Sequence, residues 1–170
     1  MIAKEASRES PLWAAALRPE AQREHEPVFS LLSQERYALG VETIYEGYLL
    51  HYGRPRLFAP PNREEGLLLG DYLYAHGLVR IAAMRDVQAV SDLASLISLC
   101  AQLRAEDANG NGDGIVWAAT AALAGTDGLE GARDALRLRG DAAPLLQLAR
   151  DSAGEEAVAR SLAAHGRRVG

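Results

Sequence analysis

Basic side chains gather near the end of a long helical pattern in the first third of the chain. His51, Arg54 and Arg56 are two or three positions apart. The planar guanidinium group of arginine fits the oxygen atoms of phosphate, so this cluster is typical of a phosphate-binding site. Cations at the C-terminus of a helix also complement the helix dipole, and both interpretations stay open.

Two acidic residues are further candidates for a binding site. Glu42 shares the helical pattern of His51, and Asp71 lies in a later segment that is otherwise apolar. Burial of Asp71 would require hydrogen bonds or a cationic partner. The basic residues on its own helix, His76 and Arg80, are not three or four positions away. We therefore expect the partner of Asp71 on another helix.

The sequence contains no motif for nucleophilic, zinc or dinucleotide chemistry. It has no Ser/His/Asp series, no CxxC pair, no HExxH and no GxGxxG. We therefore expect no catalytic residue, no metal ligand and no cofactor.

One glycine-rich segment, ANGNGDG at residues 108–114, has a composition similar to that of a calcium-binding loop. Asn109, Asn111, Asp113 and Gly114 would fill positions 1, 3, 5 and 6 of such a loop. Position 12, which must supply a bidentate glutamate, is Thr120. We therefore interpret residues 108–114 as a flexible linker.

The composition excludes several classes of protein. The chain has 170 residues and a net charge of −5, and its basic residues form no stripe, so we expect no nucleic-acid partner. Its single cysteine, Cys100, lies in an apolar helical pattern and is interpreted as a small buried hydrophobe in a reducing compartment. No apolar run predicts a signal or a transmembrane segment. We expect a cytoplasmic protein.

Helices must position the candidate residues, because alanine, leucine, glutamate and arginine dominate and no period-two alternation occurs. Apolar periodicity predicts helices over residues 12–24, 27–52, 64–84, 87–106, 115–124, 129–138 and 143–165. The first is interrupted or started afresh near Pro19, and the last is broken at Gly154. We divide the chain into an N-terminal extension (1–26), a helical core (27–107), the linker (108–114) and C-terminal short helices (115–170). The C-terminal helices could pack on the core, pair with a partner or fray.

The helix over residues 64–84 is apolar almost all round, which predicts a central place in a bundle. Asn62 and Asp86 are predicted to cap this helix and the next one. Gly70 and Gly77 recur seven positions apart and predict the close approach of a neighbouring helix. The predicted fold class is all-α, a helical bundle around a buried central helical hairpin.

The helix over residues 87–106 carries a polar stripe beside its apolar face, formed by Ser91, Ser95, Ser98 and Gln102. Such a stripe meets solvent or lines a cleft between helices, and we favour solvent. In a cleft, these side chains and tyrosines such as Tyr48 would hold an apolar small molecule.

Part of the sequence resembles the polyprenyl diphosphate synthases. The segments GDYLYA at residues 70–75 and ALGVETI at 38–44, with LLH at 49–51, are similar to two helices of that family. The pair Ala101-Gln102 stands roughly where the family carries Gly-Gln or Gly-Glu. The resemblance spans about residues 37 to 105 and implies an isoprenoid-synthase-like fold.

The metal-binding aspartates of that family are absent from this sequence. In the register that we prefer, the first two fall on Tyr52 and Gly53 and the third on Arg56. A second register moves them into residues 42–46, and neither register retains the aspartate-rich box. Magnesium bound by carboxylates stabilises the diphosphate in such chemistry, so we do not expect prenyl transfer.

We therefore expect a non-catalytic helical protein that acts as an assembly or regulatory subunit, as a homo-oligomer or beside a prenyl-synthase-like partner. One alternative is a small-molecule binding protein for an isoprenoid or another apolar ligand. A second alternative is a residual prenyl-diphosphate enzyme. The candidate ligand-binding residues are Glu42, His51, Arg54, Arg56, Asp71 and Gln102.

Overall fold

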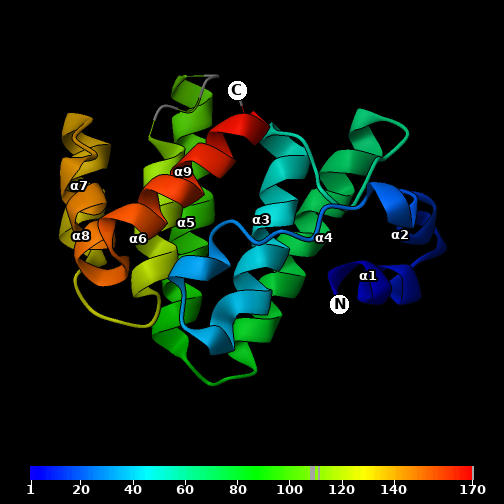
Figure 1. Cartoon of the computed structure of the whole chain (residues 1–170), viewed down its shortest axis with the longest axis horizontal. Coiled ribbons are helices and arrows are strands. Elements are labelled where there is room, and N and C mark those ends of the chain that lie inside the picture. Colours follow the sequence, from blue (N-terminus) through cyan, green and yellow to red (C-terminus); the bar gives the residue numbers. More distant parts are fainter. Residues whose placement is uncertain (108–109, 111, 170) are drawn as a thin grey trace.

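Helices dominate the described part of the chain, which in the computed structural model comprises residues 1–107, 110 and 112–169 (Figure 1). In chain order they are α1 (Ile2–Glu9), α2 (Pro11–Ala15), α3 (Ala38–Tyr52), α4 (Arg63–Ala82), α5 (Val87–Glu106), α6 (Asp113–Leu123), α7 (Leu129–Arg139), α8 (Ala143–Ala153) and α9 (Glu155–Val169). Three short 3-10 turns precede α3, at Glu20–Gln22, Ser30–Leu32 and Glu35–Tyr37. The predicted all-α class is confirmed.

The helices in the middle of the chain follow the predictions closely. α4 and α5 each begin directly after the predicted capping residue. Asn62 Oδ1 accepts a hydrogen bond from the Glu65 N–H at 2.9 Å, and Asp86 Oδ1 accepts one from the Ala89 N–H at 2.9 Å. The predicted break at Gly154 separates α8 from α9 and is also confirmed.

The interruption predicted near Pro19 is confirmed, because α2 ends at Ala15 and a 3-10 turn at Glu20–Gln22 begins after Pro19, but the rest of residues 12–24 is not helical. Two shorter helices, α1 and α2, occupy the N-terminal region, and Ser10 Oγ caps α2 by accepting a hydrogen bond from the Leu12 N–H at 3.1 Å. Beyond α2, Leu17 pairs with Phe58 in an isolated antiparallel bridge. The bridge uses backbone groups that a helix would need for its own hydrogen bonds.

The long helix predicted over residues 27–52 begins only at Ala38. A continuous helix would hold residue 28 roughly 20 Å from Glu42. Instead, the backbone N–H groups of residues 28–30 donate hydrogen bonds to Glu42 Oε1. The chain must fold back on itself before α3 to make these contacts.

α3 and α4 form the predicted hairpin and pack closely along their length. A Cβ atom added to Gly47 would lie 2.8 Å from the Gly70 carbonyl oxygen, and one added to Gly77 would lie 3.0 Å from the Gly40 carbonyl oxygen. Glycine allows the two backbones to approach this closely because it has no Cβ atom. The predicted close approach of a neighbouring helix is confirmed.

Alanine in place of Gly47 should lower the free energy of unfolding by about 1–3 kcal/mol, because its methyl group would press on a backbone oxygen of α4. The matched control is Gly131→Ala in α7, where nothing lies within 4 Å of an added Cβ atom. There the higher helix propensity of alanine should stabilise the protein by up to about 1 kcal/mol. Urea denaturation measures both changes. A Gly47→Ala variant as stable as Gly131→Ala would contradict the close packing of the hairpin.

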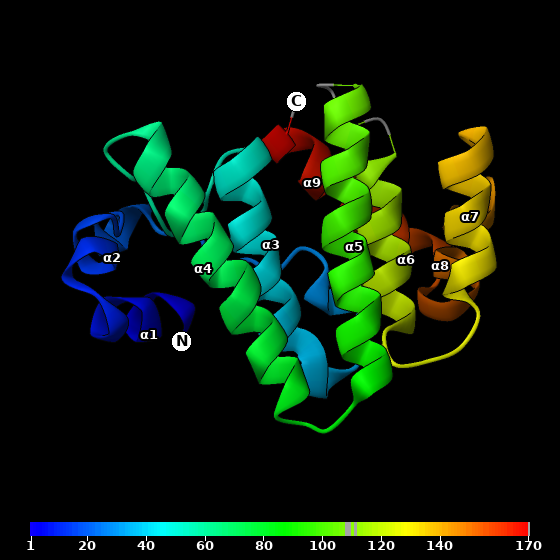
Figure 2. The same cartoon turned by 180° about the vertical axis from the view of Figure 1, so that it is seen from behind.

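Within the hairpin, α3 is central and α4 is peripheral. Ten of the 15 residues of α3 are buried, but only six of the 20 residues of α4 are. Leu68 and Val79 on α4 are 58% and 64% exposed. Figure 2 shows α4 and α5 at the front, with α3 and α6 behind them. The central place predicted for the helix over residues 64–84 is wrong, because the described part of the chain does not cover its outward apolar face.

The C-terminal helices share one hydrophobic core with α3 and α5. Trp117 of α6 is buried and stacks on Phe29, with ring centroids 5.4 Å apart. Leu145 of α8 and Val158 of α9 belong to the same core. Of the three arrangements left open for these helices, the structure has the one in which they pack on the core.

The predicted linker lies partly outside the described residues, which do not include Ala108, Asn109 and Asn111. The calcium-loop positions assigned to these two asparagines are therefore not described. Asp113 and Gly114, which we placed in the linker, instead begin α6. In the described ranges, no helix combines the length and the apolar character needed to cross a membrane.

Candidate functional site

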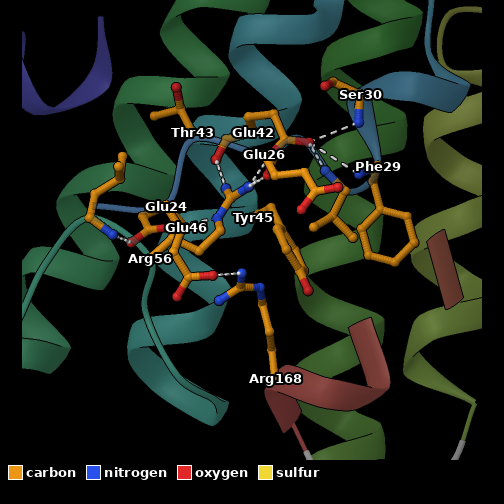
Figure 3. Close-up of polar contacts among 12 residues, drawn as sticks. Glu24, Glu26, Phe29, Ser30, Glu42, Thr43, Tyr45, Glu46, Arg56 and Arg168 are labelled. Carbon is orange, nitrogen blue, oxygen red and sulfur yellow. Dashed lines mark hydrogen bonds and ion pairs between the residues drawn. The ribbon is translucent and has the colours of Figure 1, made fainter. Parts of the chain in front are cut away.

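A buried arginine in the loop between α3 and α4 contacts two glutamates of α3 (Figure 3). Arg56 Nη1 lies 2.6 Å from Glu42 Oε2, and Arg56 Nε lies 3.0 Å from Glu46 Oε2. The two glutamates are four positions apart, so they project from the same side of the helix. The Arg56 side chain is 4% exposed, and the three residues form a buried ion-pair network.

The same carboxylates bind backbone groups of two neighbouring segments. Glu42 Oε1 accepts hydrogen bonds from the N–H groups of residues 28–30 at 2.9 to 3.1 Å. Glu46 Oε1 accepts a hydrogen bond from the Leu57 N–H at 2.7 Å. The network therefore fastens both segments to α3.

This arrangement occupies the carboxylates that a metal site would need. Burial alone would lower the pKa of Arg56, but the carboxylates of Glu42 and Glu46 raise it above its ordinary value, so the guanidinium stays charged. A magnesium ion would have to displace this guanidinium and the backbone N–H groups. Within the described residues, no group of three or more His, Cys, Asp and Glu side chains is placed to hold a metal ion. The geometry suits a structural role for the three residues.

Arg54 lies at the edge of a cavity of about 350 Å³ between residues 24–28 and α9. Its side chain donates a hydrogen bond to the Arg167 carbonyl, and its backbone N–H donates one to the Arg168 carbonyl at 2.9 Å. The predicted phosphate-binding cluster is thus divided, because Arg54 lines this cavity and Arg56 is buried against α3. Three further arginines line the cavity: Arg18, Arg167 and Arg168.

His51 and Asp71 meet across the hairpin. His51 Nε2 lies 3.1 Å from Asp71 Oδ1, which confirms that the partner of Asp71 is on another helix. The Asp71 side chain is 70% exposed, so it is not a buried acid that depends on this contact. Burial lowers the pKa of His51 even though Asp71 opposes this effect. At neutral pH the contact therefore joins a carboxylate to an uncharged imidazole.

Gln102 lies apart from the other candidate residues. It is exposed on α5, and its Nε2 donates a hydrogen bond to Glu106 Oε1 at 2.8 Å. Ser91 and Ser98 of the same stripe are also exposed and Ser95 is half-buried, so most of the stripe meets solvent as predicted. Tyr48, which a ligand-binding cleft would have used, is 1% exposed in the core. The apolar-ligand hypothesis therefore has no support from these side chains.

A second buried polar network, which no sequence pattern predicted, is centred on Asp113. Its carboxylate accepts a hydrogen bond from Tyr48 and pairs with Arg104 at 2.7 Å. His165 Nε2 lies 3.0 Å from Asp113 Oδ1, and His165 Nδ1 lies 3.0 Å from the Tyr45 hydroxyl. Burial alone would raise the pKa of Asp113, but the hydrogen bonds from His165 and Tyr48 hold it below its ordinary value. The network joins α3, α5, α6 and α9.

The chain matches no protein-family model, and neither curated proteins nor solved structures gave a significant match. The resemblance to polyprenyl diphosphate synthases therefore rests on the sequence segments that carry it and stays a prediction. Function has to be argued from the geometry of the chain itself.

Proposed function

We propose that this is a non-catalytic helical protein that self-associates through the outward face of α4 and α5 and acts as an assembly or regulatory subunit. The scarcity of charge on this face carries the proposal. Across residues 65–105, all of which are described, the exposed charged side chains are Asp71 and Arg85. Exposed apolar side chains gathered on one face mark interaction surfaces. The large ones here are Leu68, Val79, Met84 and Val87.

Besides Gln88, Gln102 and Glu106, six positions of α5 are exposed, and these six have the spacing of residues that pack against another helix. They alternate four and three positions apart, as the contact residues of paired helices do. All but the first are alanine or serine, and such small side chains leave room for a second helix at short distance. These positions are Val87, Ser91, Ala94, Ser98, Ala101 and Ala105.

A second copy of the chain is the occupant that fits this face. A face with so few charges meets its own copy with little like-charge repulsion, and a two-fold interface uses the same patch on both subunits. α4 and α5 have 20 residues each and are therefore about 30 Å long. Each helix is about 10 Å wide, so the two together offer roughly 600 Å² of outward surface, and Figure 2 shows that they diverge from the loop that joins them. This area approaches the roughly 800 Å² per partner that stable interfaces bury.

The state of the acidic residues supports the absence of catalysis. Glu42 and Glu46, which the second register sets in the metal-binding segment, are both held by Arg56. We propose that the hairpin keeps the packing of an isoprenoid-synthase-like helix pair without its metal chemistry, in a cytoplasmic protein whose one cysteine, Cys100, is free and buried. Incubation with isopentenyl and allylic diphosphates and magnesium should give no product, and turnover would contradict the proposal.

Light scattering after size-exclusion chromatography should show a dimer for the purified chain. Val79→Glu should be a monomer under the same conditions, because dimerisation would bury an unpaired carboxylate. A penalty of about 3 kcal/mol weakens association by more than 100-fold. Thermal unfolding should show that the variant remains folded, since Val79 is 64% exposed in the single chain.

The matched control is Leu138→Glu on α7. Leu138 is 78% exposed and is not part of the α4–α5 face, so this variant should remain a dimer. Two results would count against the proposal. One is a wild-type chain that stays monomeric at about 100 μM, a concentration at which even a weak dimer forms. The other is a Leu138→Glu variant that dissociates as readily as Val79→Glu.

A further inference from the structure

The cavity beside Arg54 collects positive charge in a chain whose net charge is −5. Its charged side chains come from residues 18–26, from the loop between α3 and α4, and from the end of α9. Four are arginines and two are glutamates, so the lining is positive. They are Arg18, Arg54, Arg167 and Arg168, with Glu24 and Glu26.

Only one of these four arginines forms an ion pair with a carboxylate of the described residues. Arg168 Nη2 lies 2.6 Å from Glu24 Oε2, and this hydrogen bond lowers the pKa of Glu24 below its ordinary value. Within the described residues, Arg18, Arg54 and Arg167 make no ion pair with a carboxylate. The Arg54 side chain instead donates to a carbonyl group, which is a neutral acceptor. An anion would supply the missing negative charge.

The walls of the cavity are held in place by contacts already described. Arg56 Nη1 donates a hydrogen bond to the Glu26 carbonyl at 3.0 Å, and the Arg54 N–H donates one to the Arg168 carbonyl at 2.9 Å. Figure 3 shows Arg168 reaching Glu24 beside this network. Because the segments that carry the arginines are fixed in advance, a ligand does not have to order them.

The cavity continues along α9 into a less charged region. Its volume of about 350 Å³ lies at the lower end of the roughly 300–1,000 Å³ that small-molecule sites occupy. A second cavity of about 240 Å³ shares five lining residues with it, namely Glu26, Pro27, Val28, Ala164 and Arg167, and adds Leu31, Arg160, Ser161 and Ala163. The shared residues indicate one groove, with the four arginines at one end and an apolar wall of Pro27, Leu31 and Ala164 toward the other. Arg160, which also lines the second cavity, is paired with Glu156 at 2.6 Å.

We propose that this groove binds a small organic phosphate, with the phosphate among the arginines and the organic group against the apolar wall. A phosphate monoester carries a charge close to −2 at pH 7 and offers three acceptor oxygens. Guanidinium groups bind such oxygens through paired, charge-assisted hydrogen bonds. A carboxylate carries one negative charge and two oxygens, and so satisfies fewer of the arginines.

Calorimetric titration of the full chain with phenyl phosphate tests this site. We expect saturable binding with a Kd below about 1 mM, weaker binding of inorganic phosphate, which lacks the ring, and no binding of phenol, which lacks the charge. Arg18→Gln and Arg167→Gln should each weaken the binding of phenyl phosphate about tenfold, the effect of losing one charge-assisted hydrogen bond. The control Arg139→Gln changes an exposed arginine of α7 that does not line the groove, and should bind normally.

Glu24→Gln should change the affinity in the opposite direction. It removes a negative charge from the lining and releases Arg168 for the ligand, so phenyl phosphate should bind several-fold more tightly. An unfolded variant cannot bind more tightly, and this result therefore separates a binding site from a loss of stability. The proposal is overturned if phenyl phosphate shows no saturable binding, or if inorganic phosphate binds as tightly as phenyl phosphate. It is also overturned if Arg18→Gln and Arg139→Gln lose the same affinity for phenyl phosphate, or if Glu24→Gln binds phenyl phosphate more weakly than the wild type. Dimerisation through α4 and α5 is tested separately, because the groove lies along α9.

Discussion

Replacement of Arg56 by methionine should lower the free energy of unfolding by about 3–5 kcal/mol. The variant leaves Glu42 and Glu46 buried four positions apart with no cation between them. Methionine fills much of the volume of arginine, so the effect reports the lost charge more than a cavity. The variant also loses the hydrogen bond to the Glu26 carbonyl, which releases the segment before α3.

Urea denaturation of the purified chain, followed by tryptophan fluorescence, measures this loss. Arg56→Lys should recover only part of the stability, because one ammonium group cannot reproduce the planar fork that reaches both carboxylates. Arg63→Met, which changes an exposed arginine at the start of α4, should stay within about 0.5 kcal/mol of the wild type. A loss in Arg56→Met no larger than in this control would show that the network does not stabilise the fold.

The double variant Glu46→Leu/Arg56→Met tests whether the two side chains act together. If they do, the double variant should be less destabilised than the sum of the single variants by at least about 1 kcal/mol, because each single variant already breaks the pair. Strictly additive losses would indicate that Arg56 acts through packing and its backbone contact alone.

Asp113→Ala should produce the second large effect, a loss of about 3 kcal/mol or more. The Asp113 carboxylate contacts Tyr48, Arg104 and His165, and through His165 it orients Tyr45. Without this carboxylate, the buried side chains of Arg104 and His165 lose their acidic partner, and the buried Tyr48 hydroxyl loses its hydrogen-bond acceptor. The four helices that the network joins should then unfold at lower urea concentration.

The pH dependence of this effect has a definite sign. The pKa of Asp113 is lower in the folded chain than its ordinary value, so its contribution to stability is present at neutral pH. That contribution is lost as the pH falls below about 4, through the folded-state pKa. The difference in stability between the wild type and Asp113→Asn should therefore shrink between neutral pH and about pH 2. A difference that stays constant over this range would contradict the role assigned to the carboxylate.

The starts of α4 and α5 could be predicted from the sequence, because each depends on residues within a few positions of the helix start. Asn62 and Asp86 cap α4 and α5 because a cap needs only the first turn of its own helix. The stretch before α3 was missed because Glu42 captures the N–H groups of residues 28–30, a contact that apolar periodicity does not encode. Periodicity also identified α4 as apolar on all sides, but it could not tell what covers each side.

The arginine-lined cavity was predicted only in part, because only the residues that are close together in the sequence form a recognisable pattern. Arg54 was identified from its sequence neighbourhood, and it does line an arginine-bearing cavity. Arg167 and Arg168 were not identified, because two cations in the last turn of a helix are the ordinary complement of its dipole. Their approach to Arg54 joins positions more than 100 residues apart in the chain. Such a contact arises from the packing of α9 on α3 and leaves no local pattern.

Hydroxyl-radical footprinting at protein concentrations below and above the dimer dissociation constant tests the self-association of the α4–α5 face most directly. Leu68, Val79 and Val87 should react readily at low concentration, where they are exposed, and become protected as the dimer forms. Leu31 and Leu138 are exposed to a similar degree outside this face and should react equally at both concentrations. Unchanged reactivity of Leu68 and Val79, or protection confined to Leu31 or Leu138, would contradict the proposed function.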